Sequence, residues 1–331
     1  MILVRKTMAC LSVCALLVAP SFAVEAQQPT KIPRIGYLSP GDANGSSASV
    51  EPFQQGMREL GYIEGKNILV EYRYAEGKLD RIPSLVAELV QLKPEVIVVI
   101  SLLSIRAAKQ ATKTIPIIIM STQDPVATGI IDSLAHPGGN ITGVTRLTRE
   151  LSGKRLELLK EAVPRMSRVA VLWSPDDSGA SIAFKEYQAV APSLKIQLQS
   201  LEVRDPNPDF EGAFRAAAKK SANALITITN PVLSRYLKRI ADLAISNRLP
   251  SMYERIAWVE AGGLMSYSAN DVETFKRAAT YVDKILKGAK PGDLPVQQAT
   301  KFELVINLNT AKQIGLTIPV RVLERANRVI K

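Results

Sequence analysis

Serines, aspartates and a few other polar residues follow the most apolar runs of this 331-residue sequence, where a strand would give way to a loop. Ligands of open α/β sheets bind outside the carboxyl ends of the strands, so residues at these positions are candidates for ligand binding. They suit a small polar ligand. The candidates are Ser39, Asp42, Ser101, Ser104, Thr122, Asp124, Ser174, Asp176, Ser178, Asn230, Tyr253 and Glu254.

The candidates offer partners for two opposite charges on one ligand. Ser101 or Ser104, at a predicted helix start with its free backbone N–H groups, would hold a carboxylate. Asp124, Asp176 or Glu254 would pair with an ammonium group. A second interpretation is that serine, aspartate and asparagine cap helices wherever a strand is followed by a helix. The sequence leaves both interpretations open for each residue.

Three aromatic residues lie in or at the end of predicted strands. Tyr37, Trp173 and Tyr253 could each pack against an apolar part of a ligand. For Tyr37 and Trp173, the position within a strand favours a place in the core.

The sequence lacks the residues that most enzymes use. Its single histidine, His136, lies in AHPGGN, where Pro137 and two glycines mark a turn at a helix end. There is no G-x-S-x-G or G-x-x-x-x-G-K-[ST] motif, and no G-x-G-x-x-G follows the first strand. We therefore predict that the protein is not an enzyme and carries no metal ion or cofactor.

The chain is basic, with 42 lysines and arginines against 31 aspartates and glutamates and a net charge of +11. The bases are scattered, with no run of five or more and no interleaved aromatic residues, unlike nucleic-acid-binding segments. The charge predicts solubility and a mild attraction to anionic ligands or surfaces, and no nucleic-acid partner.

The N-terminal segment has the pattern of a signal peptide over residues 1–26. Arg5 and Lys6 precede an apolar run too short to span a membrane, and small residues follow. Export to the periplasm is the prediction, with a lipoprotein as the alternative because Cys10 and Cys14 lie in this segment. These are the only two cysteines, so the mature chain would have no disulfide and no zinc thiolate.

Short apolar runs alternate with amphipathic ones from residue 34 onward, which predicts an α/β fold with parallel sheets covered on both faces. RIGYLSPGD (34–42) and RVAVLWSPDD (168–177) are near copies that start 134 residues apart, from 34 to 168. Pro116 and Pro250 share that separation. Eight predicted strands precede residue 260, more than one sheet usually holds. We therefore predict two Rossmann-like, doubly wound lobes that duplicate one architecture.

Long stretches of the sequence resemble the substrate-binding proteins of ABC transporters, in the family that includes tryptophan and tyrosine binders. They cover 33–330 and include RIGYLSPG, FQQGMRELGYIEGKNILVEYRYAEG, DPVATGIIDSLAHPGGNITGV, VEAGGLMSYSAND and LPVQQATKFELVINLNTAKQIGLTIP. The resemblance implies a type I periplasmic-binding fold, with ligand bound between two lobes that are joined by a three-crossover hinge. It implies lobe one from 33–142 with 264–293, and lobe two from 143–263 with 295–331.

The same resemblance implies a function. The protein would capture a small carboxylate-bearing or amino-acid-like ligand, close around it and present it to the permease subunits of an ABC importer, as a monomer. The family's binding loops fall on Ser39, Asp124 and Asn230. The loop SLLSIRAAK departs from the small glycine- or alanine-rich turn of many relatives, so Leu102 is expected to line and narrow the pocket.

Two other functions stay open at this point. The same fold could sense a ligand for a membrane receptor without transport, and an exported α/β enzyme is a further alternative. A permease and an ATPase encoded beside the gene would favour uptake, whereas a sensor kinase would favour signalling.

Overall fold

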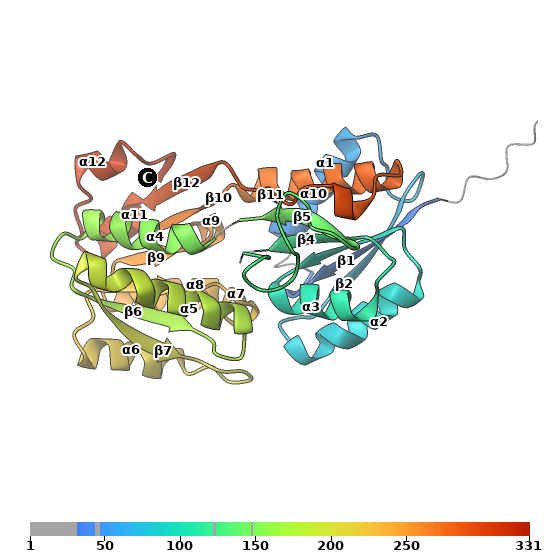
Figure 1. Cartoon of the computed structure of the whole chain (residues 1–331). Helices are drawn as coiled ribbons and strands as arrows, with labels where there is room; N and C mark the ends of the chain where they lie inside the picture. The colour runs from blue at the N-terminus through green and yellow to red at the C-terminus, as the bar shows by residue number, and fades with distance from the viewer. Residues whose placement is uncertain (1–31, 44–46, 122–123, 147) are drawn as a thin grey trace, which may run out of the picture. The chain divides into compact units, whose positions relative to one another are not determined.

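The computed structural model describes residues 32–43, 47–121, 124–146 and 148–331 (Figure 1). The predicted signal peptide and the candidate residue Thr122 lie outside these ranges. Among the helices of the described ranges, none is both long enough and apolar enough to cross a membrane.

Six strands form the first sheet, and their composition explains its burial. β3 (Val96–Ile100) and β4 (Ile117–Ser121) are almost wholly apolar, as expected for central strands of a parallel sheet covered on both faces. Every strand pair is parallel, in the order β11-β5-β4-β3-β1-β2. The remaining strands are β1 (Arg34–Ser39), β2 (Leu69–Tyr74), β5 (Ile141–Thr145) and β11 (Gln297–Gln298).

Helices cover both faces of this sheet. On one face α1 and α10 lie side by side (Figure 1), and Phe53 and Phe275 share a buried core with Tyr37. On the other face α2 and α3 pack against β3, with Ile105 in the core. These elements form what we call the first lobe. Its helices are α1 (Ser47–Glu59), α2 (Ile82–Gln91), α3 (Leu102–Ala111) and α10 (Asp271–Leu286), with the short turns η1 (Leu79–Arg81) and η3 (Pro291–Asp293).

Seven strands form the second sheet, in the order β13-β12-β10-β9-β8-β6-β7. All its pairs are parallel except that of β10 with β12, which is antiparallel. The strands are β6 (Arg168–Trp173), β7 (Gln197–Glu202), β8 (Ala224–Thr227), β9 (Ser251–Tyr253), β10 (Met265–Ala269), β12 (Phe302–Asn307) and β13 (Arg328–Ile330).

The helices of this second lobe also cover two faces. Helices α4, α5, α11 and α12 supply one core, in which Leu159 and Tyr187 are fully buried. Helices α6, α8 and α9 supply the other, with Phe214 and Trp258. The bounds are α4 (Thr148–Ala162), α5 (Ser178–Val190), η2 (Ala191–Leu194), α6 (Phe210–Lys219), α7 (Pro231–Ser234), α8 (Leu237–Ser246), α9 (Ile256–Glu260), α11 (Leu308–Gln313) and α12 (Val320–Leu323).

The two sheets repeat one strand order, as the near-copied segments predict. The first contains β5-β4-β3-β1-β2, and the second contains β10-β9-β8-β6-β7, which is the same order when each strand is renumbered by five. Strand β1, from RIGYLSPGD, and strand β6, from RVAVLWSPDD, therefore occupy equivalent positions. The prediction of an α/β fold with two doubly wound lobes is confirmed.

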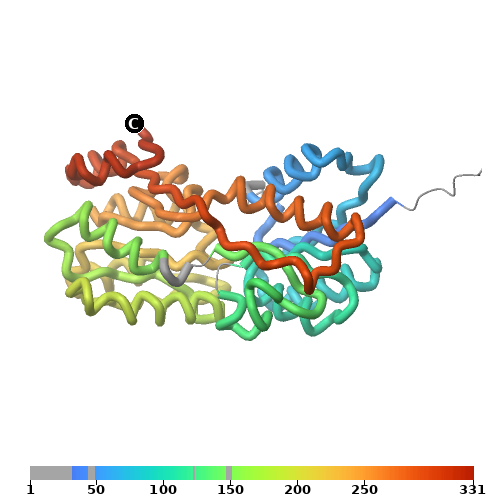
Figure 2. Tube along the Cα trace, turned by 45° about the horizontal axis from the view of Figure 1, so that its top comes forward, coloured from blue at the N-terminus to red at the C-terminus, as the bar shows by residue number. Residues whose placement is uncertain are grey.

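The chain changes sheet after β5, after β10 and after β11, and Figure 2 shows the last passage, from α10 to the red C-terminal segment. The strands of the two sheets do not follow the lobe boundaries that the resemblance implies. The resemblance implies that 264–293 belongs to lobe one, but strand β10 belongs to the second sheet because its backbone pairs with β9 and β12. Strand β5 pairs with β4 as far as Thr145, and β11 pairs with β5, so both belong to the first sheet. Where each lobe ends as a folding unit stays a prediction.

Candidate functional site

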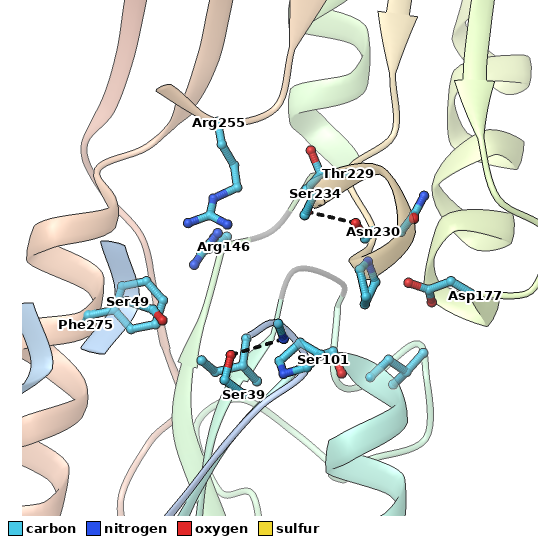
Figure 3. A pocket seen from close by; sticks show the side chains of 15 residues that line it. Ser39, Ser49, Ser101, Arg146, Asp177, Thr229, Asn230, Ser234, Arg255 and Phe275 are labelled. Atoms are coloured by element: carbon cyan, nitrogen blue, oxygen red, sulfur yellow. Dashed lines mark hydrogen bonds between the residues drawn. The ribbon is translucent and has the colours of Figure 1, made fainter. Parts of the chain in front are cut away.

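A cavity of about 130 Å³ lies where strand ends of both lobes meet (Figure 3). The first lobe supplies the segments that follow β1 and β3, and the second lobe supplies those that follow β6, β8 and β9. This is the edge of the sheets at which α/β proteins bind ligands. The lining residues are Ser39, Pro40, Gly41, Ser49, Ile100, Ser101, Leu102, Arg146, Asp177, Thr229, Asn230, Pro231, Ser234, Arg255 and Phe275.

Ser101 begins α3 at the cavity in an unusual backbone conformation, with φ of 81° and ψ of 150°. Its Oγ accepts a hydrogen bond from the Ser104 N–H at 3.4 Å and lies 3.1 Å from Ser104 Oγ. A non-glycine residue at such a φ costs about 1–3 kcal/mol, and residues of this kind cluster at ligand sites. The strained turn lets the first turn of α3 face the cavity.

Two arginines share one carboxylate at the wall of the cavity. Arg146 Nη1 lies 3.1 Å from Asp271 Oδ1, and Arg255 Nε donates to Asp271 Oδ2 at 3.0 Å. Arg146 is 9% exposed and also lies over the Phe275 ring, 5.4 Å from its centroid. Its Nε has no hydrogen-bond partner among the described residues. One carboxylate for two guanidiniums leaves a positive charge at this wall.

Burial and charge oppose each other in this group. Burial by itself would raise the pKa of Asp271, but Arg146 and Arg255 outweigh it and hold the pKa below its usual value. Burial lowers the pKa of Arg146, against the attraction of Asp271. Because an arginine guanidinium keeps its proton in proteins, Asp271 is ionised and both arginines are cations near neutral pH.

Asp177 faces the cavity from the opposite side (Figure 3). It caps α5, and its Oδ1 accepts a hydrogen bond from the Gly179 N–H at 2.8 Å. Burial raises the pKa of Asp177, and the hydrogen bonds from Gly179 and Ala180 only partly offset this effect. Asp177 is half-buried and faces the cavity, so it is a candidate partner for a cationic group on a ligand, which would favour its ionised form.

A second buried ion pair lies behind the two arginines. Arg155 donates from Nε to the Tyr267 carbonyl at 2.8 Å and from Nη1 to Glu254 Oε1 at 3.3 Å. Glu254 Oε2 accepts from the Thr229 N–H at 2.9 Å. Burial raises the pKa of Glu254, against the attraction of Arg155. This pair holds the backbone of the 229–231 segment that lines the cavity.

Four of the predicted site residues line the cavity, namely Ser39, Ser101, Leu102 and Asn230. Leu102 lies in the cavity lining, and whether it narrows the pocket for a ligand stays a prediction. Ser104 lies beneath Ser101 and is fully buried. Whether these residues contact a ligand stays a prediction.

The other predicted residues that the structure describes are not among those lining the cavity. Asp42 follows the lining residue Gly41 and has an interaction within the chain. Ser174 is buried, whereas Ser178 is exposed on α5. Tyr253 is fully buried and stacks on Trp258 with ring centroids 5.0 Å apart.

The three carboxylates predicted to bind an ammonium group have other partners. Asp124 accepts hydrogen bonds from the N–H groups of Val126 and Ala127, and it lines a separate groove against α5. Asp176 pairs with Arg204 at 2.7 Å. Glu254 pairs with Arg155 and accepts from the Thr229 N–H, and whether it also contacts a ligand stays a prediction.

The charged residues of the cavity were not predicted. Arg146 follows β5 by one position and Asp177 adjoins Asp176, so the rule that polar residues follow strands could have found both. Arg255 follows Glu254 in the same way. Phe275 comes from α10, and only the return of that helix to the first lobe brings it here.

The described residues contain no group of three or more His, Cys, Asp or Glu side chains placed to hold a metal ion. The arrangement instead offers a cationic wall, a facing carboxylate and apolar surface from Ile100, Leu102 and Phe275. It is suited to reversible binding of a small charged molecule.

Comparisons with known proteins agree with this arrangement. A family model described as ABC transporter substrate binding protein matches residues 38–330. The tyrosine-binding protein of Clostridioides difficile (strain R20291) is 26% identical over 264 residues, which are 80% of this chain and 75% of that protein.

Two solved structures have the same fold. A conserved domain protein from Vibrio cholerae O1 biovar El Tor has a TM-score of 0.84 and 28% identity, covering 90% of this chain and 100% of that one. An ABC domain from Streptococcus pneumonia in complex with L-Trp has a TM-score of 0.81 and 24% identity, covering 90% and 99%.

Proposed function

Because the chain belongs to the ABC transporter substrate-binding proteins and has their type I periplasmic-binding fold, we propose that it captures a small amino-acid-like ligand in the cavity between its lobes. It delivers this ligand to the permease subunits of an ABC importer. The observation that carries the proposal is the pair of arginines that share Asp271 and face Asp177 across the cavity.

The charges of the site match those of a zwitterion. Arg146 and Arg255 supply two positive charges, and Asp271 and Asp177 supply two negative ones, so the group is neutral as a whole. The positive wall would bind a carboxylate, for which the guanidinium is well shaped. Asp177 on the opposite side would bind an ammonium group.

The remaining walls suit the uncharged part of such a ligand. Ile100, Leu102 and Phe275 supply apolar surface, and Ser39 and Ser101 supply hydroxyl groups. The cavity has a volume of about 130 Å³. Its apolar walls suit an apolar or aromatic side chain, in line with the tyrosine and tryptophan named for two relatives.

The setting of this function follows from the family and from the N-terminal sequence. Residues 1–26 would direct export to the periplasm and be removed. The protein would work there as a monomer. Closure of the lobes around the ligand would present the form that the permease accepts.

Ligand-induced stabilisation tests the proposal. The protein, expressed with its own signal segment, is purified from the periplasm, unfolded to release carried-over ligand and refolded. Its melting temperature is then measured with each of the common L-amino acids and with their desamino acids. A ligand at 100 times its Kd stabilises the native state by about 2.7 kcal/mol, which is a clear shift.

We expect at least one amino acid to raise the melting temperature and its desamino analogue to raise it less. The absence of any shift across the amino acids would contradict the proposal. A shift with desamino acids that matches or exceeds the shift with amino acids would move the ligand class to simple carboxylates.

A further inference from the structure

Asp271 lies outside the cavity lining, yet both cavity arginines bind it. It is the first residue of α10 and follows β10 by two positions, at the second passage between the sheets. Arg146 follows β5, at the first passage, and Arg255 begins α9 in the second lobe. One carboxylate thus joins three segments that are distant in sequence.

Each oxygen of Asp271 faces one arginine. Oδ2 accepts a hydrogen bond from Arg255 Nε at 3.0 Å, whereas Oδ1 makes an ion-pair contact with Arg146 Nη1 at 3.1 Å and has no hydrogen-bond partner among the described residues. Two guanidiniums close together repel each other, and each has a long side chain with many rotamers. A carboxylate shared by both guanidiniums offsets this repulsion and favours the rotamers that reach it.

Arg146 keeps one buried donor that no described residue uses. Its contact with Asp271 is through Nη1, and its Nε has no hydrogen-bond partner among the described residues. The face of its guanidinium lies over Phe275. The neighbouring acid Glu254 is held by Arg155 and by the Thr229 N–H, so it cannot replace Asp271 in this role.

We propose that Asp271 is a positioning residue for ligand binding: it fixes the guanidiniums of Arg146 and Arg255 side by side so that they receive one carboxylate. This inference rests on the proposed function of the cavity. Two simpler roles make different predictions. Asp271 could serve only the N-terminus of α10, where a carboxylate is favourable, or it could serve only to neutralise charge.

The Asp271→Asn variant separates these roles by the sign of its effect. If Asp271 only neutralised charge, its loss would leave the wall with two positive charges and would tighten carboxylate binding. If it served only α10, affinity would not change. As a positioning residue, its loss weakens binding by about tenfold or more, as removal of groups that orient direct ligands does in metal sites.

Affinity is measured by calorimetry with L-tyrosine and L-tryptophan as probes. The matched control is Asp283→Asn, because Asp283 is on the same helix, is 13% exposed against 11% for Asp271, and pairs with Lys287 and Tyr62 instead. The control variant is expected to bind as the wild type does. Tighter or unchanged binding in Asp271→Asn, with the control unchanged, would overturn the proposal.

A second readout needs no ligand. Arginine side-chain ¹⁵N NMR spectra of the ligand-free protein, assigned with Arg146→Lys and Arg255→Lys, should show slow guanidinium rotation for both residues. Asp271→Asn should release both at once, and Asp283→Asn should release neither. If the wild type binds neither probe, the amino-acid function fails for these probes, while this readout still decides whether Asp271 holds the arginines.

The Asp271→Glu variant covers the case in which Asp271→Asn does not fold. It keeps the buried charge but moves the carboxylate outward by one methylene. We expect it to melt near the wild-type temperature and yet to bind the probes more weakly. Wild-type affinity in this variant, together with unchanged arginine spectra, would overturn the proposal.

Discussion

The loops after β1 and β6 hold equivalent positions in the two sheets but bring different chemistry to the cavity. At the end of β1, the cavity is lined by Ser39, Pro40 and Gly41, none of which is charged. After β6, it is lined by Asp177, which carries a carboxylate, while Ser174 is buried. Duplication therefore conserved the strand order and the place of the loop, while the groups that meet a ligand diverged.

The same contrast extends to the rest of the cavity. The first lobe contributes serines and apolar side chains from β3, α1, α3 and α10. The charged groups come from the second lobe and from the first passage between the sheets. The second lobe and this passage would therefore set which charges the ligand must carry, and the first lobe would set its shape. Changes to charged residues should cost the most affinity.

Replacement of Arg146 tests the charged wall most severely. Arg146→Met keeps the length and apolar bulk of the side chain and removes the charge. Loss of a buried group that pairs with a ligand charge costs about 2–5 kcal/mol, so binding of the amino acid found in the thermal screen should fall by about 30-fold to several thousand-fold. Calorimetry measures the loss.

The matched control for this change is Arg73→Met, which removes a half-buried arginine of the first lobe that pairs with Glu88 at 2.9 Å and does not line the cavity. This variant should keep wild-type affinity. If Arg146→Met also keeps it, the ligand carboxylate binds elsewhere.

Asp177 and Asp176 provide a comparison between adjacent carboxylates. Asp177→Asn keeps the α5 cap, because asparagine caps as well as aspartate, but it removes the charge that faces the cavity. A hydrogen bond to a charged group is worth about 1.5–3 kcal/mol, so amino-acid affinity should fall by about 10- to 150-fold. Asp176→Asn, which loses only the partly exposed pair with Arg204, should leave affinity unchanged. If both variants change amino-acid affinity equally, Asp177 does not bind the ligand.

The pH dependence of ligand affinity also tests whether Asp177 binds the ammonium group of the ligand. Because burial raises the pKa of Asp177, this group protonates at a higher pH than an ordinary aspartate and then no longer attracts an ammonium group. Affinity for the amino acid should fall as the pH drops through that raised pKa. The Asp177→Asn variant should lack this step. Calorimetry over a pH series would show it, and parallel curves for both proteins would contradict the assignment.

Folding stability should respond to Asp177 and Asp271 in opposite directions. A raised pKa means that the folded chain binds a proton more readily than the unfolded chain, so protonation of Asp177 favours folding as the pH falls. The lowered pKa of Asp271 means that its contribution is present above the pKa of the unfolded chain and is lost as the pH falls through the folded value. The change in the free energy of unfolding as the pH falls is therefore the sum of these two opposite contributions.

Sequence patterns predicted the fold better than the site, for a physical reason. Continuous apolar strands such as β3 can only be buried under helices on both faces, so periodicity determines the layers. The same rule located Ser39 and Ser101 at strand ends. It could not choose between Asp176 and Asp177, because one residue turns toward Arg204 and the other toward the cavity.

Long-range pairing explains the remaining differences. Glu254 looked available in sequence, but Arg155 approaches it from 99 positions away. Phe275 and Asp271 reach the site because α10 returns to the first lobe after β10 has joined the second sheet. Such pairings depend on where the chain crosses between sheets, which hydrophobic periodicity does not determine.

A contact between the lobes can be tested at Gly77, in the first-lobe loop whose backbone supports the cavity segment. The Gly77 N–H donates to the Pro40 carbonyl at 2.9 Å. Gly77 has φ of 74°, and an added Cβ would lie 2.8 Å from Nε of Arg235 in the second lobe. The flexible end of Arg235 would have to shift, and its ion pair with Asp205 with it, so Gly77→Ala should destabilise the protein by at least the cost of the backbone strain, about 1 kcal/mol.

Gly61→Ala isolates the contribution of that contact. Gly61 has φ of 88°, but a Cβ there would meet no described atom within 4 Å, so only the backbone cost applies. Thermal and urea unfolding of both variants would give the difference. Equal losses of stability would mean that Arg235 does not press on this loop in solution.

The smallest expected effect concerns the strained turn at Ser101. Ser101→Gly removes the cost of a non-glycine residue at φ of 81° but also removes the cap hydrogen bond to Ser104, and glycine in a cap position costs only a few tenths of a kcal/mol. We expect the variant to be more stable by roughly 0.5–1 kcal/mol. Because the hydroxyl lines the cavity, ligand affinity should fall modestly at the same time. Urea unfolding and calorimetry on one preparation would show the two opposite changes, whereas a loss of stability would mean that the turn is not strained.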